Sequence, residues 1–278
     1  MKISVIIVNH NAAEYVRRAI ASLPAACGSY EFESIVVDNS DVPEPIGEAD
    51  RWVSMENRGF GAGCNYGATL ASGELLLFLN PDGEPEKGAV AAAAELLLHT
   101  PEGGLTGIRT LLPDGSFETG CLRGFPTPLR AICYYLRLDR LFPRNRVCGG
   151  YHLAWLDREQ NQEAESVSGS FMLLRGSLFR ELGGFDEDFF MYGEDLDLCW
   201  RVREAGKKVL YCADGTLLHH HGKCGRNERQ TSAFYDSMLL FYDKHFLSRY
   251  SALTTAAVRA AVSLLRRRAL GAWRRDND

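Results

Sequence analysis

The sequence lacks the motifs that mark several common enzyme classes. None of its eight cysteines forms a C-x-x-C pair, which argues against redox dithiols and paired-cysteine zinc sites. The P-loop G-K-[ST] sequence and the G-x-S-x-G nucleophile elbow are also absent, so P-loop nucleotide hydrolysis and typical serine hydrolase chemistry are excluded. No uncharged apolar stretch is long enough to span a bilayer, and the apolar run after Lys2 is too short for the core of a signal peptide. These absences favour a reducing, cytoplasmic setting.

Negative charge exceeds positive charge over the chain as a whole. The 278 residues carry a net charge of −5, so a nucleic-acid partner is not expected. Residues 249–278 contain seven Arg, no Lys and two Asp, a local charge of +5 that leaves −10 for the first 248 residues. Hydrophobic residues make up 46% of the chain, which is enough for a substantial core. Because there are no repeats and no low-complexity linker, the sequence favours one domain followed by a basic tail.

Short apolar runs alternate with helical patterns over the first hundred residues. The strand-like runs are 3–8, 32–41, 52–53 and 74–80, and the helical patterns are 12–23, 61–73 and 88–100. This alternation predicts an α/β fold with a doubly wound, mostly parallel central sheet flanked by helices. Ligands of such sheets bind beyond the carboxyl ends of the strands. Polar residues follow three of those ends, and they are Asn9 and Asn11, Asp38 and Asn39, and Asn80 and Asp82.

The rest of the chain is less regular. Residues 101–165 contain five prolines and are expected to form loops with a helical insertion at 129–141. Further along, the patterns are those of a strand, turn and helix at 166–182, a helix at 192–206, and a strand and loop at 207–222. Helical patterns dominate from Ser232 onward, so the tail is predicted to be helical.

Two clusters of carboxylates could carry chemistry. Asn80-Pro81-Asp82 follows a buried apolar strand, where a carboxylate can bind a divalent metal, although a capped turn has the same composition. Glu194 and Asp195 begin a helix among Phe and Tyr side chains. Such surroundings raise a carboxyl pKa towards values that suit a general base, although ordinary charge bias at a helix N-terminus gives the same pattern.

Three consecutive histidines end the strand-like run at 207–222. Imidazoles at this place, His219, His220 and His221, could ligate a metal or form an ordinary surface loop. Cys212 and Cys224 lie nearby, but their spacing matches no usual zinc pattern.

The segment "NRGFGAGCNYG" at 57–67 is rich in glycine. A dinucleotide fingerprint needs G-x-G-x-x-G directly after the first strand. Here the third glycine position is Cys64, and the segment comes too late in the chain. A Rossmann enzyme that transfers hydride is therefore disfavoured.

Taken in order, these segments resemble the inverting glycosyltransferases of family 2, which have the GT-A fold. They are most similar to the rhamnosyltransferase-like branch that builds bacterial cell-surface polysaccharide. The matching segments are "SVIIVNHN", "IVVDNSD", "NRGFGAGCNYG", "LLLFLNPDGEP", "SGSFMLLRGSLFRELGGFDEDFFMYGEDLDLCWR" and "LLHHHG". They cover most of residues 1–222, so the resemblance implies a glycosyltransferase domain over 1–222 and a helical tail over 223–278. Within that domain it implies a nucleotide-sugar half at 1–110 and an acceptor half at 160–222.

The resemblance also implies a nucleotide-diphosphate-sugar donor and a Mg²⁺ or Mn²⁺ ion. Residues that match the family's donor-binding positions are Asn9, Asp38, Arg58, Asn65, Asn80 and Asp82. Asn80 replaces the first Asp of the family's D-x-D motif, which leaves Asp82 as the expected direct metal ligand. Asp195 matches the catalytic base, and Glu194 is the neighbour that could be confused with it. His219 matches a histidine that binds the metal in some members, with His221 as the alternative register.

The branch suggests rhamnose, from a thymidine diphosphate donor, as the transferred sugar, and a glycan or lipid-linked acceptor. Residues 253–275 could form a basic amphipathic helix on the inner face of the cell membrane, or a helix packed on the protein body. Two other functions are weighed against the transferase: a sugar nucleotidyltransferase and a non-catalytic sugar-nucleotide or glycan-binding module. The first would need a Gly-rich basic loop after strand one, where this chain has "NHNAAEYV".

Overall fold

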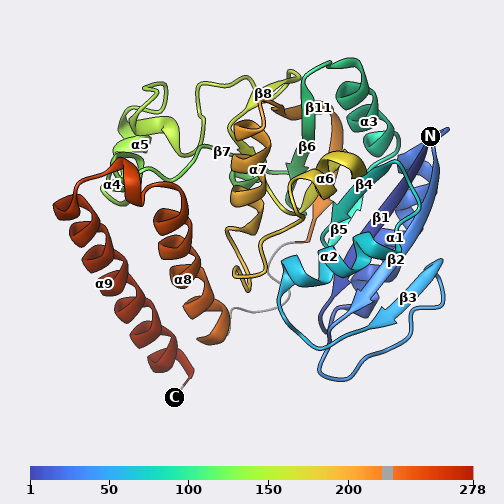
Figure 1. The fold of residues 1–278 in the computed structure, drawn as a ribbon, viewed down its shortest axis with the longest axis horizontal. Coiled ribbons are helices and arrows are strands. Elements are labelled where there is room, and N and C mark those ends of the chain that lie inside the picture. Colours follow the sequence, from blue (N-terminus) through green and yellow to red (C-terminus); the bar gives the residue numbers. More distant parts are fainter. Residues whose placement is uncertain (221–227, 278) are drawn as a thin grey trace.

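A nine-stranded sheet runs through the centre of the molecule, with helices on both faces (Figure 1). The computed structural model describes residues 1–220 and 228–277. The strands of this sheet are β1 (Lys2–Asn9), β2 (Glu31–Asp38), β3 (Arg51–Ser54), β4 (Leu75–Leu79), β5 (Gly83–Pro85), β6 (Gly103–Leu111), β8 (Gln162–Ala164), β10 (Phe171–Arg175) and β11 (Lys208–His219). The α-helices are α1 (Ala13–Cys27), α2 (Phe60–Leu70), α3 (Ala89–His99), α4 (Pro128–Tyr135), α5 (Leu138–Leu141), α6 (Gly176–Glu181), α7 (Glu194–Glu204), α8 (Glu228–His245) and α9 (Ala252–Asn277). A second sheet pairs β7 (Leu122–Arg123) with β9 (Ser166–Val167).

The strand order of the central sheet is β3-β2-β1-β4-β10-β6-β11-β5, with β8 also paired to β11. Strands β3, β2, β1 and β4 run parallel, as the sequence predicts, and β6 runs parallel to β11. Strand β10 lies antiparallel between β4 and β6, and β5 and β8 lie antiparallel to β11. The predicted α/β class is confirmed, but the sheet is mixed. The apolar pattern of residues 166–182 predicts a strand and does not encode its direction.

Strands β1 and β4 are apolar on both faces because helices cover both. Ile3, Val5 and Ile7 of β1 belong to a core that includes α1 and α3. Ile6 and Val8 point the other way, into a core that includes α2 and α7. The unbroken apolar run of β4 is therefore that of a central strand in a sheet covered on two sides.

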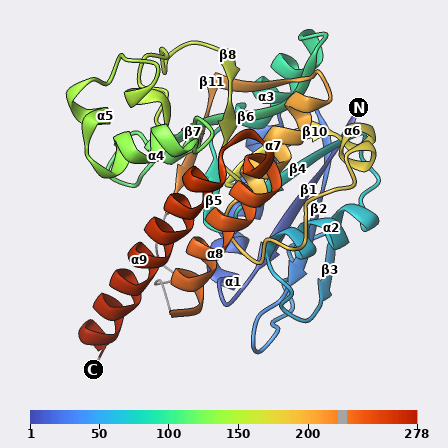
Figure 2. The same cartoon turned by 60° about the vertical axis from the view of Figure 1, so that its left-hand side comes forward.

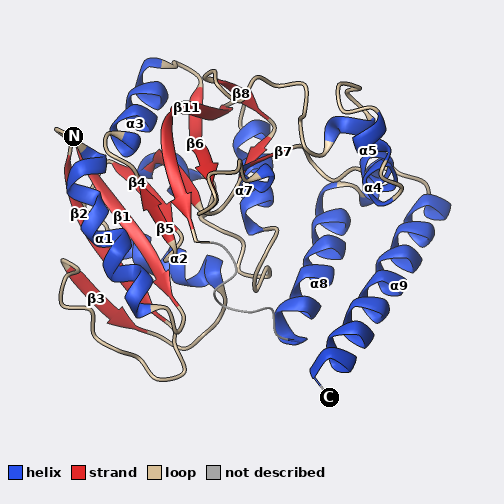
Figure 3. Cartoon of the chain, turned by 180° about the vertical axis from the view of Figure 1, so that it is seen from behind, coloured by secondary structure: helices blue, strands red, loops and turns tan. Residues whose placement is uncertain are grey.

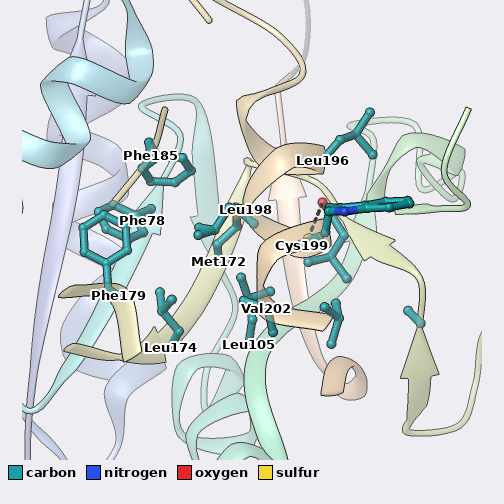
Figure 4. Close-up of a cluster of buried hydrophobic side chains, with 14 of the residues drawn as sticks. Phe78, Leu105, Met172, Leu174, Phe179, Phe185, Leu196, Leu198, Cys199 and Val202 are labelled. Carbon is teal, nitrogen blue, oxygen red and sulfur yellow. Dashed lines mark hydrogen bonds between the residues drawn. The ribbon is translucent and has the colours of Figure 1, made fainter. Parts of the chain in front are cut away.

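Phenylalanine rings and aliphatic side chains share the core on the α7 side (Figure 4). The ring of Phe78 on β4 contacts those of Phe179 and Phe185, with centroid distances of 4.8 and 4.9 Å. Leu198 and Val202 of α7 are fully buried in the same cluster. This packing holds α7 on the sheet and so fixes where the N-terminus of α7 lies.

Strand β6 occupies residues for which the sequence predicts loops, and that prediction was wrong. Its glycines give the stretch the composition of a loop, but in the structure they let neighbouring side chains pack closely against the strand. A Cβ on Gly104 would lie 2.7 Å from Val202 Cγ1, and one on Gly107 would lie 2.5 Å from Val167 Cβ. Either approach is too close for any side chain, so glycine is required in this strand. The helical insertion predicted in the same region is confirmed as α4 and α5.

Helices α8 and α9 form an antiparallel hairpin on the α7 side of the molecule (Figure 3). Ion pairs between their described residues include Arg259–Asp243 at 2.9 Å, Arg266–Asp236 at 2.9 Å and Arg274–Glu228 at 2.6 Å. The predicted helical tail is confirmed, while the domain boundary placed at 222–223 lies outside the described residues. Among the helices of the described residues, none is long and apolar enough to cross a membrane.

A buried carboxylate fastens α7 to α8. Asp197 is fully buried and accepts from His245 Nε2 at 2.8 Å, Lys244 Nζ at 2.7 Å and Arg201 Nε at 2.7 Å. Burial raises the pKa of Asp197, but the hydrogen bond from His245 and the charges of Arg201 and Lys244 outweigh burial and lower it to about 2. Ionisation of Asp197 therefore stabilises the contact between the two helices.

We expect Asp197→Asn to lower the free energy of unfolding by about 3 kcal/mol at pH 7, because three donors lose a buried charge. The folded pKa lies below the unfolded value of about 3.9, so the stabilisation is complete at higher pH and is lost as pH falls towards 2. Denaturant unfolding at pH 7 and at pH 3.5 should show a wild-type advantage that narrows in acid. Glu181→Gln, an exposed carboxylate, is the matched control. An advantage that stays constant between the two pH values would contradict this account.

Candidate active site

The turn after β4 lies beside the end of β11. Asn80-Pro81-Asp82 leads directly into β5, and β5 pairs with β11 so that Gly83 lies opposite His219. The backbone N–H of His220 donates to the carbonyl oxygen of Asp82 at 2.9 Å. Two segments that are 137 residues apart in sequence therefore meet at one end of the sheet.

Asp82 and His219 are brought into direct contact. His219 Nε2 lies 3.1 Å from Asp82 Oδ1, and Asn80 Nδ2 lies 3.4 Å from the same nitrogen. On the other side of the ring, His219 Nδ1 lies 2.8 Å from Glu118 Oε2. Burial lowers the pKa of His219, but the hydrogen bonds to Asp82 and Glu118 outweigh burial and raise it to about 9. Sequence reasoning missed Glu118, because it lies among the irregular residues 101–165 and belongs to no motif.

Asp82 and His219 together fit a cation that is also bound by phosphate. A metal-binding histidine characteristically donates the N–H of its other ring nitrogen to a carboxylate or a backbone carbonyl. Glu118 is the carboxylate in that position for His219. Mg²⁺ sites often use one or two protein ligands and complete their shell with substrate phosphates. The described residues contain no group of three His, Cys, Asp or Glu side chains that could hold a metal ion. The alternative ligand His221, like Cys224 of the weak zinc hypothesis, lies outside the described residues.

Asp195, at the start of α7, has partners for both of its side-chain oxygens. Its Oδ2 forms an ion pair with Arg123 of β7 and accepts from the backbone N–H of Gly169 at 2.9 Å. Its Oδ1 accepts from the backbone N–H of Leu196 at 2.8 Å. No sequence motif pointed to Arg123, which also lies among the irregular residues 101–165.

Glu194 has the opposite environment, although it is the next residue in the chain. Its side chain is buried, and its Oε2 has no hydrogen-bond partner among the described residues. Burial, and then the charge of Asp195, raise the pKa of Glu194 to about 8. Glu194 is therefore protonated at neutral pH.

One short segment touches both halves of this arrangement. Ser170 accepts from the backbone N–H of Asn80 at 3.0 Å through its carbonyl oxygen, and Gly169 donates to Asp195. This segment leads into β10, whose antiparallel pairing with β4 sets Phe171 opposite Leu79. The reversed direction of β10 is therefore what places the Asp195 side of the site beside the Asp82 turn.

Asn9 and Asp38 lie side by side at the carboxyl ends of β1 and β2. Both side chains are buried and hold backbone: Asn9 Oδ1 accepts from Ala12 N at 3.0 Å, and Asp38 accepts from Ser40 N at 2.9 Å and Glu44 N at 3.0 Å. They shape the loops that follow these strands. Their predicted contact with a nucleotide stays a prediction.

Arg58 and Asn65 are placed elsewhere. Arg58 Nη2 pairs with Glu187 Oε2 at 2.7 Å, and both residues line a surface hollow of about 470 Å³ together with Asn65. Asn65 donates to Phe185 O at 2.9 Å and to Glu187 Oε1 at 3.0 Å, and accepts from Phe185 N at 2.8 Å. Within the described residues, neither Arg58 nor Asn65 has a hydrogen bond or ion pair with Asp82 or His219.

The glycines of this segment serve helix packing. A Cβ on Gly67 of α2 would lie 2.5 Å from Ile6 Cγ2, and one on Gly63 would lie 2.9 Å from Val8 Cγ1. The helix can approach β1 this closely only because these positions carry no side chain. The glycine pattern therefore has a structural cause that requires no phosphate.

The family model described as "Glycosyl transferase family 2" matches residues 4–164. N-acetylglucosaminyl-diphospho-decaprenol L-rhamnosyltransferase of Mycobacterium tuberculosis is 28% identical over 87% of this chain and 84% of its own length. Rhamnosyltransferase WbbL of Escherichia coli is 27% identical over 78% of this chain and 83% of its own. O-antigen biosynthesis protein RfbC of Myxococcus xanthus is 29% identical over 84% of this chain, but the chain spans only 18% of that relative.

Solved structures show the same fold at low sequence identity. S. aureus TarS 1-349 in complex with UDP-GlcNAc matches with a TM-score of 0.59 and 17% identity, over 96% of this chain and 72% of that one. GalNAc-T7 with UDP, GalNAc and Mn2+ matches with a TM-score of 0.57 and 15% identity, over 95% of this chain and 54% of that one. These likenesses confirm the expected GT-A fold.

We expect Asn65→Ala to destabilise the protein by about 2 kcal/mol, because it leaves the backbone groups of Phe185 without partners. Thermal unfolding should show a lowered midpoint, whereas Tyr66→Ser on the neighbouring, more exposed position should change it little. Nucleoside diphosphate affinity, measured by calorimetry below the unfolding temperature, should stay within about threefold of wild type. An unchanged midpoint with a large loss of affinity would instead support the predicted donor contact.

Proposed function

The chain belongs to glycosyl transferase family 2, and on that premise we propose that it is an inverting, metal-dependent transferase of cell-surface polysaccharide synthesis. It moves a sugar, with rhamnose as the best candidate, from a nucleotide-diphosphate donor to a hydroxyl of a glycan or lipid-linked acceptor. The names of the relatives support this choice of sugar and acceptor. The observation that carries the proposal is the hydrogen bond from Gly169 to Asp195, because the same segment before β10 also holds the Asp82 turn through Ser170.

Asp195 acts as the general base in this proposal. It takes the proton of the acceptor hydroxyl as the oxygen attacks the anomeric carbon. The bond from that carbon to the donor phosphate breaks, and the nucleoside diphosphate leaves with both bonding electrons. Attack from the face opposite the leaving group inverts the anomeric configuration, and no covalent sugar–enzyme intermediate is needed.

The contrast with Glu194 supports the choice of Asp195. A general base accepts a proton in its ionised form, and Asp195 is the one of the two carboxyls that Arg123 contacts. Glu194, with a pKa of about 8, is protonated at neutral pH. We infer that Glu194 stays protonated beside the site and does not serve as the base.

Asp82 and His219 would hold Mg²⁺ or Mn²⁺ against the donor diphosphate. Such a cation supplies positive charge that offsets the negative charge growing on the leaving group. Glu118 orients the ring of His219 for this role. Asn9 and Asp38 shape the loops at the carboxyl ends of β1 and β2, where the nucleotide is expected to bind.

We place the enzyme in the cytoplasm, as a peripheral protein on the inner face of the cell membrane, because a lipid-linked acceptor would be reached there. Contact through residues 253–275 stays a prediction. Three arginines of α9 are already paired with carboxylates of α8, as the packed alternative requires.

We expect Asp195→Asn to lower turnover at least about a hundred-fold while donor binding is kept, because the amide cannot accept the proton. Glu194→Gln is the matched neighbour: an amide resembles the protonated acid in shape, so most activity should remain at pH 7. The measurement is release of nucleoside diphosphate from thymidine diphosphate rhamnose and a panel of other nucleotide sugars. The base assignment fails if Asp195→Asn stays nearly as active as wild type. A binding module would release no nucleotide at all.

We expect Asp82→Ala to abolish the metal-dependent part of donor binding, because His219 alone is a weak site for a hard cation. Calorimetry with thymidine diphosphate, with and without Mn²⁺, should show tightening by the metal in the wild type and none in the variant. Asp114→Ala, in an exposed turn, should behave like the wild type. Equal tightening by Mn²⁺ in Asp82→Ala would remove Asp82 from the metal site.

A further inference from the structure

Large apolar side chains are exposed mainly on one segment, residues 129–147. Of the fifteen large apolar side chains that are exposed in the described residues, this segment holds eight. They are Leu129, Ile132, Tyr134, Tyr135, Leu136, Leu141, Phe142 and Val147. Leu141 is 70% exposed and Phe142 57%, on a surface where scattered single residues are the usual finding.

The same segment exposes positive charge and no negative charge. The exposed side chains of Arg137, Arg140, Arg144 and Arg146 lie among the apolar ones. Asp139, its one acidic residue, is buried, with its carboxylate 3.7 Å from His152. This surface therefore complements an anionic partner that has an apolar layer beneath its charges.

The segment is anchored to the body of the protein. Arg130 forms two hydrogen bonds with Glu165, at 2.6 and 2.7 Å, and Thr127 caps α4 through the backbone N–H of Arg130. Cys133 lies on the buried side of α4, and its sulfur is 3.3 Å from that of Cys148. The exposed apolar side chains are thus presented on a fixed platform and are not the ends of a frayed loop.

The platform is directly connected to the proposed catalytic groups. Arg123, the partner of Asp195, lies five residues before the start of α4. Figure 2 shows α4 and α5 at the far end of the molecule from β3, beyond α7. A surface on which α4 and α5 rest would therefore lie towards the Asp195 side of the site.

We propose that residues 129–147 form a docking surface for an anionic phospholipid bilayer. The apolar side chains enter the headgroup region, the tyrosines lie at its polar boundary, and the four exposed arginines meet lipid phosphates. This deepens the proposed function and rests on it in one respect: a lipid-linked acceptor would reach Asp195 from the same membrane.

One other membrane-binding surface and one other partner for residues 129–147 agree less well with the structure. Helix α9 was the expected membrane helix, but its exposed large apolar side chains are Leu253 and Leu264, and three of its arginines are paired with α8. A second copy of this chain on α4 and α5 would bring two sets of four arginines together across a two-fold axis. That like-charge contact opposes association, whereas lipid phosphates neutralise it.

The test is sedimentation of the full-length protein with vesicles of phosphatidylglycerol and phosphatidylcholine, and with phosphatidylcholine alone. We expect the wild type to bind the anionic vesicles and to be released by salt. Leu141→Ser with Phe142→Ser, and separately Arg144→Gln with Arg146→Gln, should each weaken binding about tenfold or more. Leu253→Ser with Leu264→Ser on α9 is the matched control and should bind like the wild type.

Either of two results would overturn the proposal: both platform variants bind like the wild type, or the α9 control alone loses binding. Sedimentation velocity could give a third such result: the wild type forms a dimer that the platform variants dissociate, and the protein binds no vesicles. The variant Arg144→Gln with Arg146→Gln keeps the test valid if the variant Leu141→Ser with Phe142→Ser does not fold. Release of nucleoside diphosphate from a soluble donor is measured in parallel and should be unchanged in all variants. Normal vesicle binding without any such release would refute the proposed function and leave the docking surface standing.

Discussion

The arrangement of the site depends on the ion pair between Arg123 and Asp195. Asp195 sits at the start of a helix that is packed on the core, where a carboxylate is costly to bury without partners. Arg123 and the backbone N–H groups of Gly169 and Leu196 offset that cost. Glu194, one residue away, has no partner for its Oε2 among the described residues, and burial raises its pKa to about 8. Two carboxyls that are adjacent in the chain are thus given different surroundings.

That ion pair also explains why the irregular middle of the chain matters. Arg123 and Glu118 both come from residues 101–165, and each completes a group supplied by a recognisable motif. Arg123 pairs with the carboxylate of Asp195, while Glu118 lies against Nδ1 of His219. The motifs supply the candidate side chains, and the connecting segment supplies charged groups that contact them.

The sequence predicts the parts of this protein that depend on local pattern. The strands around Ile6 and Phe78, the helix that begins at Glu194, and the helical tail are confirmed because their periodicity reflects burial on fixed faces. Strand β6 was missed because its glycines are required by close packing against Val167 and Val202, which are distant in sequence. Contacts of this kind, like the direction of β10, depend on which elements become neighbours, and a local pattern does not record that.

The site follows the same division. The resemblance assigned Asp82 and His219 to one metal site, and the structure places them in contact because β5 pairs with the end of β11. Asn65 was assigned to the donor from its place in a glycine-rich motif, yet its side chain satisfies the backbone of Phe185. A polar side chain that satisfies buried backbone groups has little freedom left to recognise a ligand. Asn65 engages three of its four hydrogen-bonding positions within the fold, so folding gives this position a cause, and its contact with the donor stays a prediction.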